Sequence, residues 1–407
     1  MADATAQTAP LPLEGVTVLD CSRVFAGPHA TMLLADLGAD VWKLEPPSGD
    51  ETRGWGPPFW GDPADGRSAY FAAVNRNKRS VVVNLKTDAG RGILDRLAAR
   101  ADVLMHNYLP SVAAKLGMEP DRLRARHPHL VVSTVRGFPG SGALAERPAY
   151  DLVAQAWSGQ MAVTGEPEGE PIKIGVGLLD LLAGLEAAVA ALAGLAAQKR
   201  GPGGPRARQA LAPQASVSLV EAAVAGLSNV LGYYLATGQE PRRWGTGHPD
   251  IVPYQVFAAR DGHLVVAVGN DAQFARFCTL LGVEVRPEWA TNPDRIPRRD
   301  DVLAVLAPRI AEWQRDDLVA AMIAADVPGS PVHSVGEAAT AMRQIEPDWI
   351  TTLDGVQLPA SPIWINGARL PIRRPPPRLG EHTDEILGQI GLSEAEVAEL
   401  RSEGVVA

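Results

Sequence analysis

The sequence has few cysteines, no excess of basic charge and no apolar N-terminal segment of the signal-peptide kind. Only Cys21 and Cys278 occur among 407 residues, and the formal net charge of −9 argues against nucleic acid as a partner. The one long apolar run, 178–197, contains two acids and many alanines and glycines, so we expect a buried helix and not a membrane span. We therefore expect a reduced, cytoplasmic protein.

The motifs of several common enzyme classes are also missing. The sequence contains no G-x-S-x-G, H-E-x-x-H, C-x-x-C, P-loop or G-x-G-x-x-G pattern. His127 and His129 bracket a proline and are typical of surface residues, so we expect no metal site. The remaining possibility is carboxylate chemistry, for which Asp180, Asp151 and Glu45 are the candidates.

Strand and helix patterns alternate along the first part of the chain. Strands are predicted at 16–20, 40–44, 80–85, 102–106 and 130–135, and helices at 27–37 and 88–100. This alternation predicts an α/β fold, with a parallel sheet covered by helices on both faces. The loop after the first strand, CSRVFAGP, leads into a helix N-terminus, where phosphate could bind.

The second part of the chain predicts a smaller α+β domain. Residues 201–205 (GPGGP) are the clearest boundary, and 206–214 look irregular. The later predictions are helices at 151–157, 218–235, 273–281, 302–314, 318–325 and 393–402, a hairpin of strands 254–257 and 263–268, and an extended segment at 359–377.

Asp180 is the first candidate for a functional residue because it is one carboxylate within the run KIGVGLLDLLAGL. We expect it near the start of a helix, exposed and kept ionised by the helix dipole. Gly175, Gly177 and Gly184 flank it and would let the backbone approach a ligand closely. The alternative is that Asp180 only caps the helix.

Several motifs along the chain resemble the class III CoA-transferases, which include formyl-CoA:oxalate transferases and α-methylacyl-CoA racemases. The similar stretches are LPLEGVTVLDCSRVFAGPHATMLLADLGADVWKLE, NRNKRSVVVNLK, DVLMHNYLP, RPAYDLVAQAWSGQMAVTGEP, VGLLDLLAGL and LGEHTDEIL. Two further stretches, RRWGTGHPDIVPYQVFAARDGHLVVAVGNDAQF and RPPPRLGEHTDEIL, look most like the succinyl-CoA:glutarate (dicarboxylate) CoA-transferase branch.

The resemblance implies that Asp180 is a nucleophile that forms an aspartyl-CoA thioester. CoA would move from an acyl-CoA such as succinyl-CoA to a short dicarboxylate such as glutarate. Tyr150, Gly175 and Gly177 would lie at the substrate or its oxyanions. Asp151 is a possible supporting acid, or else the cap of the helix that follows it. CoA esters would be substrates, and no permanently bound cofactor is expected.

The resemblance also implies binding residues. CoA contacts are expected at Val24, Phe25, Ala26, Lys86, Asn107, Tyr108 and Lys115. Pro46 and Pro148 replace basic residues of the family, and we predict Arg76, Lys78 and Arg79 as substitutes. The candidates for binding the acceptor carboxylate are Arg53, Arg136 and Arg147.

The family resemblance implies a homodimer of two chains interlinked like rings. Each chain would have a Rossmann-like large domain (1–205), a small domain (215–335) and a segment that returns to the large domain (336–407). Two other functions remain open. One is an acyl-CoA racemase, disfavoured because Tyr150 stands where racemases have histidine. The other is a CoA-ester binding protein without catalysis.

Overall fold

The computed structural model describes residues 10–199 and 212–407, so the predicted break at 201–205 lies outside the described residues. The chain divides into two compact units. Unit 1 comprises Met1–Gln160, Ile174–Leu235 and Asp348–Ala407, and unit 2 comprises Met161–Lys173 and Ala236–Pro347. This division differs from the predicted domains, since 215–235 belong to unit 1 and 336–347 to unit 2.

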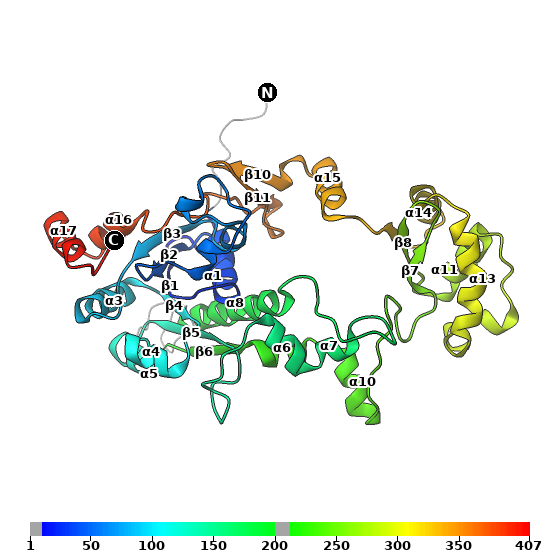
Figure 1. Cartoon of the computed structure of the whole chain (residues 1–407), viewed down its shortest axis with the longest axis horizontal. Coiled ribbons are helices and arrows are strands. Elements are labelled where there is room, and N and C mark those ends of the chain that lie inside the picture. The colour runs from blue at the N-terminus through cyan, green and yellow to red at the C-terminus, as the bar shows by residue number, and fades with distance from the viewer. Residues whose placement is uncertain (1–9, 200–211) are drawn as a thin grey trace. The chain divides into compact units, whose positions relative to one another are not determined.

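Unit 1 is built on a six-stranded parallel sheet with the order β3-β2-β1-β4-β5-β6 (Figure 1). The strands are β1 (Thr17–Asp20), β2 (Asp40–Glu45), β3 (Lys78–Val82), β4 (Val103–His106), β5 (Val131–Arg136) and β6 (Gln214–Ser218). The direction of strand order reverses between β1 and β4. In open sheets of this kind, the loops after the two strands at that point form the binding crevice.

Helices cover both faces of the sheet, as the alternating pattern predicted. The helices of unit 1 before the chain returns are α1 (Ala26–Asp36), α2 (Ala69–Ala72), α3 (Asp88–Arg100), α4 (Pro110–Leu116), α5 (Pro120–Arg126), α6 (Asp151–Ser158), α8 (Leu178–Lys199), α9 (Leu219–Ala225) and α10 (Asn229–Thr237). Val18 packs into a core with α1, α8 and α9, whereas the next residue, Leu19, packs into a second core with α3 and α5. Strands buried on both faces explain the continuous apolar runs in the sequence.

Helix α8 is the apolar run that was predicted to be a buried helix. Its length and composition alone would suffice to cross a membrane. In the structure it contacts α1, α9, β5 and β6, and Ala183, Ala187 and Ala191 are fully buried. Gly184 permits the close contact with α1, because a Cβ there would lie 2.7 Å from the carbonyl oxygen of Ala26. This glycine therefore serves helix packing and not approach to a ligand.

Unit 2 is a smaller α+β body. It contains α7 (Gln160–Val163), which begins in unit 1, and an antiparallel sheet of β7 (Tyr254–Ala258), β8 (His263–Ala267) and β9 (Gly329–Pro331). Its other helices are α11 (Asp271–Leu280), α12 (Asn292–Arg295), α13 (Arg299–Ala311), α14 (Arg315–Ala324) and α15 (Val335–Ile345). The predicted hairpin 254–268 is confirmed.

After unit 2 the chain returns to unit 1. The returning elements are β10 (Ile350–Leu353), β11 (Val356–Pro359), β12 (Trp364–Ile365), β13 (Ala368–Arg369), α16 (Thr383–Gln389) and α17 (Glu394–Ser402). The short 3₁₀ helices are Glu51–Gly54, Pro63–Asp65, Pro287–Trp289, Ile296–Arg298 and Pro347–Trp349. The returning segment covers the edge strand β3, since Val406 forms a bridge with Val83 and the His382 N–H donates to the Ser80 carbonyl.

Three predictions of secondary structure were wrong in detail. The predicted helix 218–235 is two helices, separated at Ser228, whose φ of 49° lies in the left-handed region. The edge strand β6 was not predicted, and only its first residue, Gln214, falls in the segment predicted as irregular. Strand β3 begins at Lys78, two residues earlier than predicted, which places basic residues inside the sheet.

Candidate active site

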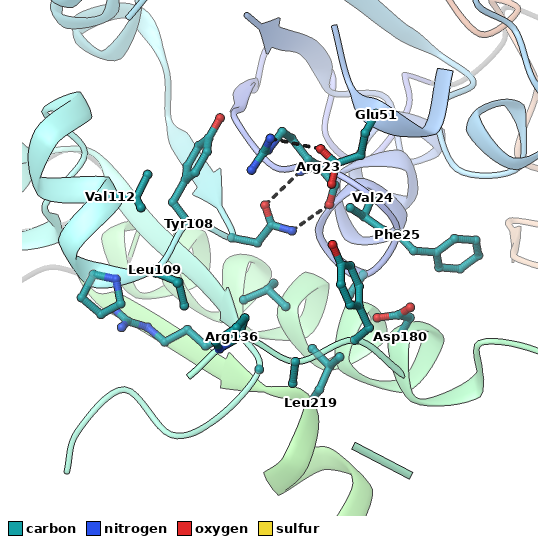
Figure 2. Close-up of a pocket in the computed structure, with 18 of the residues that line it drawn as sticks. Arg23, Val24, Phe25, Glu51, Tyr108, Leu109, Val112, Arg136, Asp180 and Leu219 are labelled. Carbon is teal, nitrogen blue, oxygen red and sulfur yellow. Dashed lines mark hydrogen bonds and ion pairs between the residues drawn. The ribbon is translucent and has the colours of Figure 1, made fainter. Parts of the chain in front are cut away.

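A cavity of about 250 Å³ lies at the point where the strand order reverses (Figure 2). Loops after β1, β4 and β5 and the first turn of α8 contribute to its walls. It brings together these residues singled out from the sequence: Val24, Phe25, Ala26, Asn107, Tyr108, Pro148, Tyr150, Arg136 and Asp180. Residues more than 150 positions apart in the chain thus share one site, as the predicted fold requires.

Asp180 is the third residue of α8, and its neighbour is a second carboxylate. Asp151, the first residue of α6, accepts the N–H groups of Leu179 (2.8 Å) and Asp180 (3.3 Å) through Oδ2, and Gln155 donates to its other oxygen. Asp151 therefore lies near the predicted nucleophile and caps α8. The alternative that it caps α6 is wrong, because its side chain points to the other helix.

The environment of Asp180 differs from the predicted one. Asp180 is 9% exposed. Its burial and the charge of Asp151 raise the pKa of Asp180 to about 7. The prediction of an exposed, fully ionised carboxylate is therefore wrong. The reason is that the helix N–H groups expected to stabilise its charge donate to Asp151 instead.

The flanking glycines contribute unequally. A Cβ at Gly177 would lie 3.5 Å from Oδ2 of Asp180 and 3.9 Å from Oδ2 of Asp151, so this backbone touches both carboxylates. Gly175 is exposed, and a Cβ there would have no atom within 4 Å. Neither glycine lines the cavity described above.

The predicted basic contacts with CoA do not reach the cavity. Arg76, Lys78 and Arg79 are at most 4% exposed and pair with aspartates: Arg76 with Asp36 at 2.6 Å, Lys78 with Asp20 at 2.9 Å and Arg79 with Asp40 at 2.9 Å. These ion pairs correct the prediction that the three cations bind phosphate. The basic run belongs to the sheet and its supports, since β3 starts within it.

Lys86 and Lys115 are exposed and lie outside the lining of the cavity. Among the three arginines considered for the acceptor, Arg53 is buried in a bidentate pair with Glu45 (2.7 Å for each contact). Arg147 stacks over Phe138, with its guanidinium carbon 4.9 Å from the ring centre, and does not line the cavity. Both structural roles argue against acceptor binding by these two residues.

Arg136 is the third candidate, and it does line the cavity. Its Nη1 is buried without a hydrogen-bond partner in the structure, and it forms no ion pair with an acid of residues 10–199 or 212–407. Burial lowers the pKa of Arg136, although the charge of Glu146 partly opposes this. A half-buried guanidinium with one buried nitrogen that lacks a partner is a place where an anion can bind.

Several residues of the site had escaped the sequence analysis. Arg23 pairs with Glu51 at 3.1 Å and stacks over Tyr108, whose pKa burial raises to about 12. Burial and then the charges of Asp180 and Asp151 raise the pKa of Tyr70, whose ring packs 5.4 Å from that of Phe25 and 5.0 Å from that of Trp55. The concentration of aromatic residues around 55–71 was the signal for the contacts of Tyr70.

No cluster of metal-ligating side chains is present in the described part of the chain. Residues 10–199 and 212–407 contain no group of three or more His, Cys, Asp or Glu side chains placed to hold a metal ion. The two cysteines are buried and unpaired. The residues that line the cavity include carboxylates, arginines and aromatic rings.

Comparison with known proteins identifies the family of the chain. Residues 13–383 match the model of CoA-transferase family III. Succinate–glutarate CoA-transferase of Agrobacterium fabrum is 37% identical over 93% of this chain and 96% of that protein. Succinyl-CoA:glutarate CoA-transferase of Homo sapiens is 36% identical over 97% of this chain and 90% of that protein.

The fold has counterparts among solved structures. A CaiB/BaiF family protein from Brucella suis has a TM-score of 0.82 at 36% identity, covering 94% of this chain and 100% of that chain. A structure from Mycobacterium tuberculosis has a TM-score of 0.81 at 28% identity, covering 92% of this chain and 99% of that chain. The chain therefore belongs to CoA-transferase family III and is an enzyme of the class III CoA-transferase type.

Proposed function

We propose that the protein transfers CoA from succinyl-CoA, or a similar dicarboxyl-CoA, to a short dicarboxylate such as glutarate, with Asp180 as the nucleophile. The observation that carries this proposal is the buried carboxylate of Asp180 at the cavity wall beside Asp151, where burial and the Asp151 charge raise its pKa to about 7. Such a group is ionised in a large fraction of molecules at neutral pH, yet it is more basic and hence a better nucleophile than an ordinary aspartate.

The first half of the reaction loads CoA onto Asp180. An oxygen of its carboxylate attacks the thioester carbonyl of the donor, the C–S bond breaks, and CoA leaves as a thiolate. The product is a mixed anhydride between the donor acid and Asp180. The thiolate then attacks the Asp180 carbonyl and releases the donor as a free carboxylate, which leaves an aspartyl-CoA thioester.

The second half repeats these steps in reverse. The acceptor carboxylate attacks the aspartyl thioester and expels the thiolate, which then attacks the acceptor side of the new anhydride. The products are acceptor-CoA and the Asp180 carboxylate, so no proton or electron is consumed. The loops that line the cavity would hold the thiolate beside the anhydride between the two attacks.

Asp151 supports this chemistry by its position. By accepting the two N–H groups at the start of α8, it fixes the turn that carries Asp180. Its negative charge also keeps the nucleophile basic. Tyr150, which lines the cavity and is 58% exposed, would contact the acyl group and not abstract a proton, because a phenol is a poor base near neutral pH.

Arg136 is the residue that we assign to the distal carboxylate of a dicarboxylate substrate. Its unpartnered Nη1 in the cavity supports this choice over Arg53 and Arg147, whose guanidinium groups already have partners. A planar guanidinium can bind a carboxylate with two parallel hydrogen bonds. Monocarboxylates would lack this contact and be poorer acceptors.

We also propose that the protein acts as a homodimer in the cytoplasm. Large apolar side chains on α6 and α8, which contact each other, are about half exposed in the single chain: Leu152 (51%), Trp157 (51%), Leu185 (48%) and Val189 (65%). Exposed apolar surface of this kind is characteristic of protein interfaces. Light scattering coupled to size-exclusion chromatography would give twice the chain mass if the proposal is correct.

The mechanism is tested by intact mass measurement after incubation with succinyl-CoA, followed by peptide mapping of a hydroxylamine-trapped sample. We expect the adduct on the peptide containing Asp180, and none in Asp180→Asn. Retained CoA binding without any adduct or transfer would contradict the proposal and leave a CoA-ester binding protein. Exchange of the α-proton of an α-methylacyl-CoA would instead support a racemase.

A further inference from the structure

Val24, in the loop between β1 and α1, has a backbone conformation that its side chain disfavours. Its φ is 72°, within the left-handed region that β-branched residues rarely adopt. The other non-glycine residues with positive φ in the described chain are Asn, Ser and Asp, so Val24 stands apart in chemistry. It also lines the cavity that contains Asp180. Strain of this kind persists only where the surroundings enforce it.

Two side chains enforce the conformation directly. Asn107, which follows β4, accepts the N–H of Arg23 at 2.9 Å and donates to the Arg23 carbonyl at 2.7 Å. Asp50 then accepts the N–H of Val24 through both oxygens, at 3.3 and 3.4 Å. The backbone is thus held on both sides of the peptide unit that turns the chain.

Asp50 is itself fixed by a buried lysine. Lys43, on β2, places its Nζ 3.0 Å from Asp50 and 3.1 Å from the carbonyl oxygen of Ser22, and both charged side chains are fully buried. One ammonium group therefore joins the start of the loop to the carboxylate that holds its middle. Thr52 adds its N–H (3.0 Å) and hydroxyl (2.8 Å) to the same carboxylate.

The clamp, defined as Lys43 and Asp50, contributes no atom to the lining of the cavity. It contacts the chain at Val24, which with Phe25 lies in the β1–α1 loop (Figure 2), and these two residues and Ala26, the first residue of α1, line the cavity. Relaxation of Val24 to an ordinary negative φ would rotate the peptide that joins it to Phe25. The wall that faces the substrate would then change shape while the sheet stayed intact.

We propose that the buried Lys43–Asp50 pair is a positioning element for CoA transfer, because it holds Val24 in the left-handed conformation that shapes one wall of the cavity containing Asp180. The inference rests on the proposed function, since the substrate is taken to be a CoA ester bound in this cavity. The proposal has a testable consequence for the residue at position 24. Glycine at position 24 adopts a φ of 72° without strain, so it should remove the need for the clamp.

The experiment uses the full chain with the clamp replaced by neutral residues of similar size, Lys43→Met with Asp50→Asn. Removing both charges together avoids an unpaired buried charge, which would destabilise the fold. We expect kcat/KM for succinyl-CoA to fall at least tenfold and the affinity for free CoA to weaken several-fold. Adding Val24→Gly should recover at least threefold in kcat/KM.

The matched control adds Asn366→Gly to the same clamp variant. Asn366 also has a positive φ, 53°, but is exposed in the turn between β12 and β13. We expect no recovery from this glycine. If the double variant does not fold, Asp50→Glu, which keeps the charge pair but displaces the carboxylate from Val24, takes its place in the same comparison.

The proposal is overturned if the clamp variant keeps wild-type kcat/KM, or if Val24→Gly recovers no more than Asn366→Gly. If the wild-type protein itself shows no transferase activity, that result counts against the proposed function instead. In that case the affinity for free CoA is measured by calorimetry on the same variants. A weaker affinity in the clamp variant, restored by Val24→Gly and not by Asn366→Gly, supports the role of the clamp, and an unchanged affinity contradicts it.

Discussion

Replacing the proposed nucleophile, Asp180→Asn, should stabilise the protein at alkaline pH while abolishing transfer. The pKa of Asp180 is raised from 3.8 to about 7 by burial and by Asp151. An acid with a raised pKa holds its proton more tightly in the folded state. Ionisation therefore destabilises the fold increasingly as pH rises from about 4 to about 7, and fully above that.

The size of the effect follows from the shift. About three pKa units correspond to roughly 4 kcal/mol at pH 8, because each unit is about 1.36 kcal/mol. At pH 5 Asp180 is already ionised in the unfolded chain but mostly protonated in the folded protein, so the raised pKa destabilises the fold by roughly 1.5 kcal/mol. The neutral asparagine avoids this cost, so the gain in stability from Asp180→Asn should be about 2.5 kcal/mol greater at pH 8 than at pH 5.

Urea unfolding at both pH values, followed by circular dichroism, measures this difference. The matched control is Asp301→Asn, because Asp301 is likewise the third residue of a helix, α13, but is exposed. We expect no comparable dependence on pH for the control. An equal change at pH 5 and pH 8 for Asp180→Asn, or a loss of stability at pH 8, would refute the reasoning that burial and Asp151 make the charge costly.

Three further outcomes follow from the site. Asp151→Asn keeps an acceptor for the start of α8 but removes a charge, so the pKa of Asp180 should fall and the acid limb of the kcat/KM profile should move to lower pH. Arg136→Met should raise KM for glutarate roughly 10- to 100-fold, the loss of a hydrogen bond to a charged group, and leave KM for a monocarboxylate unchanged. Arg76→Met should lower stability by about 3–5 kcal/mol, because it leaves Asp36 buried and unpaired, whereas calorimetry should show unchanged affinity for CoA. An unchanged pH profile in Asp151→Asn would contradict the first expectation. An equal rise in KM for glutarate and the monocarboxylate in Arg136→Met would contradict the second, and weaker CoA binding in Arg76→Met would contradict the third.

The fold of the large unit was largely predictable because its signals are local. Buried parallel strands are short apolar runs, and capping residues such as Thr87 mark where helices begin. Strand β6 gave no such signal, since its sequence QASVS is polar and it lies at the sheet edge, where exposure is tolerated. The apolar run around Asp180 singled out that residue, and the resemblance to a family added its role as nucleophile and the loop residues of the cavity.

The errors in the site have one physical origin, which is that sequence shows charges but not their partners. Arg76, Lys78 and Arg79 looked like an exposed basic run, yet their aspartates lie about 40 or more positions away and meet them only in the fold. The pKa of Asp180 was misjudged in the same way. Its helix N–H groups were assigned to the nearest carboxylate in sequence, whereas Asp151 accepts them from another helix.

The returning segment has a consequence for how the protein is made. Unit 1 is discontinuous, and edge strand β3 is covered by residues of the returning segment, among them residues near 382 and 406. During synthesis, at about 5–20 residues per second, the sheet waits on the order of ten to thirty seconds after residue 235 for that cover. An uncovered edge strand is a template for pairing with other chains. A longer interval should therefore increase the need for chaperones during synthesis. Variants shortened before Val405 lack part of this cover, so we expect them to aggregate more and give a lower soluble yield.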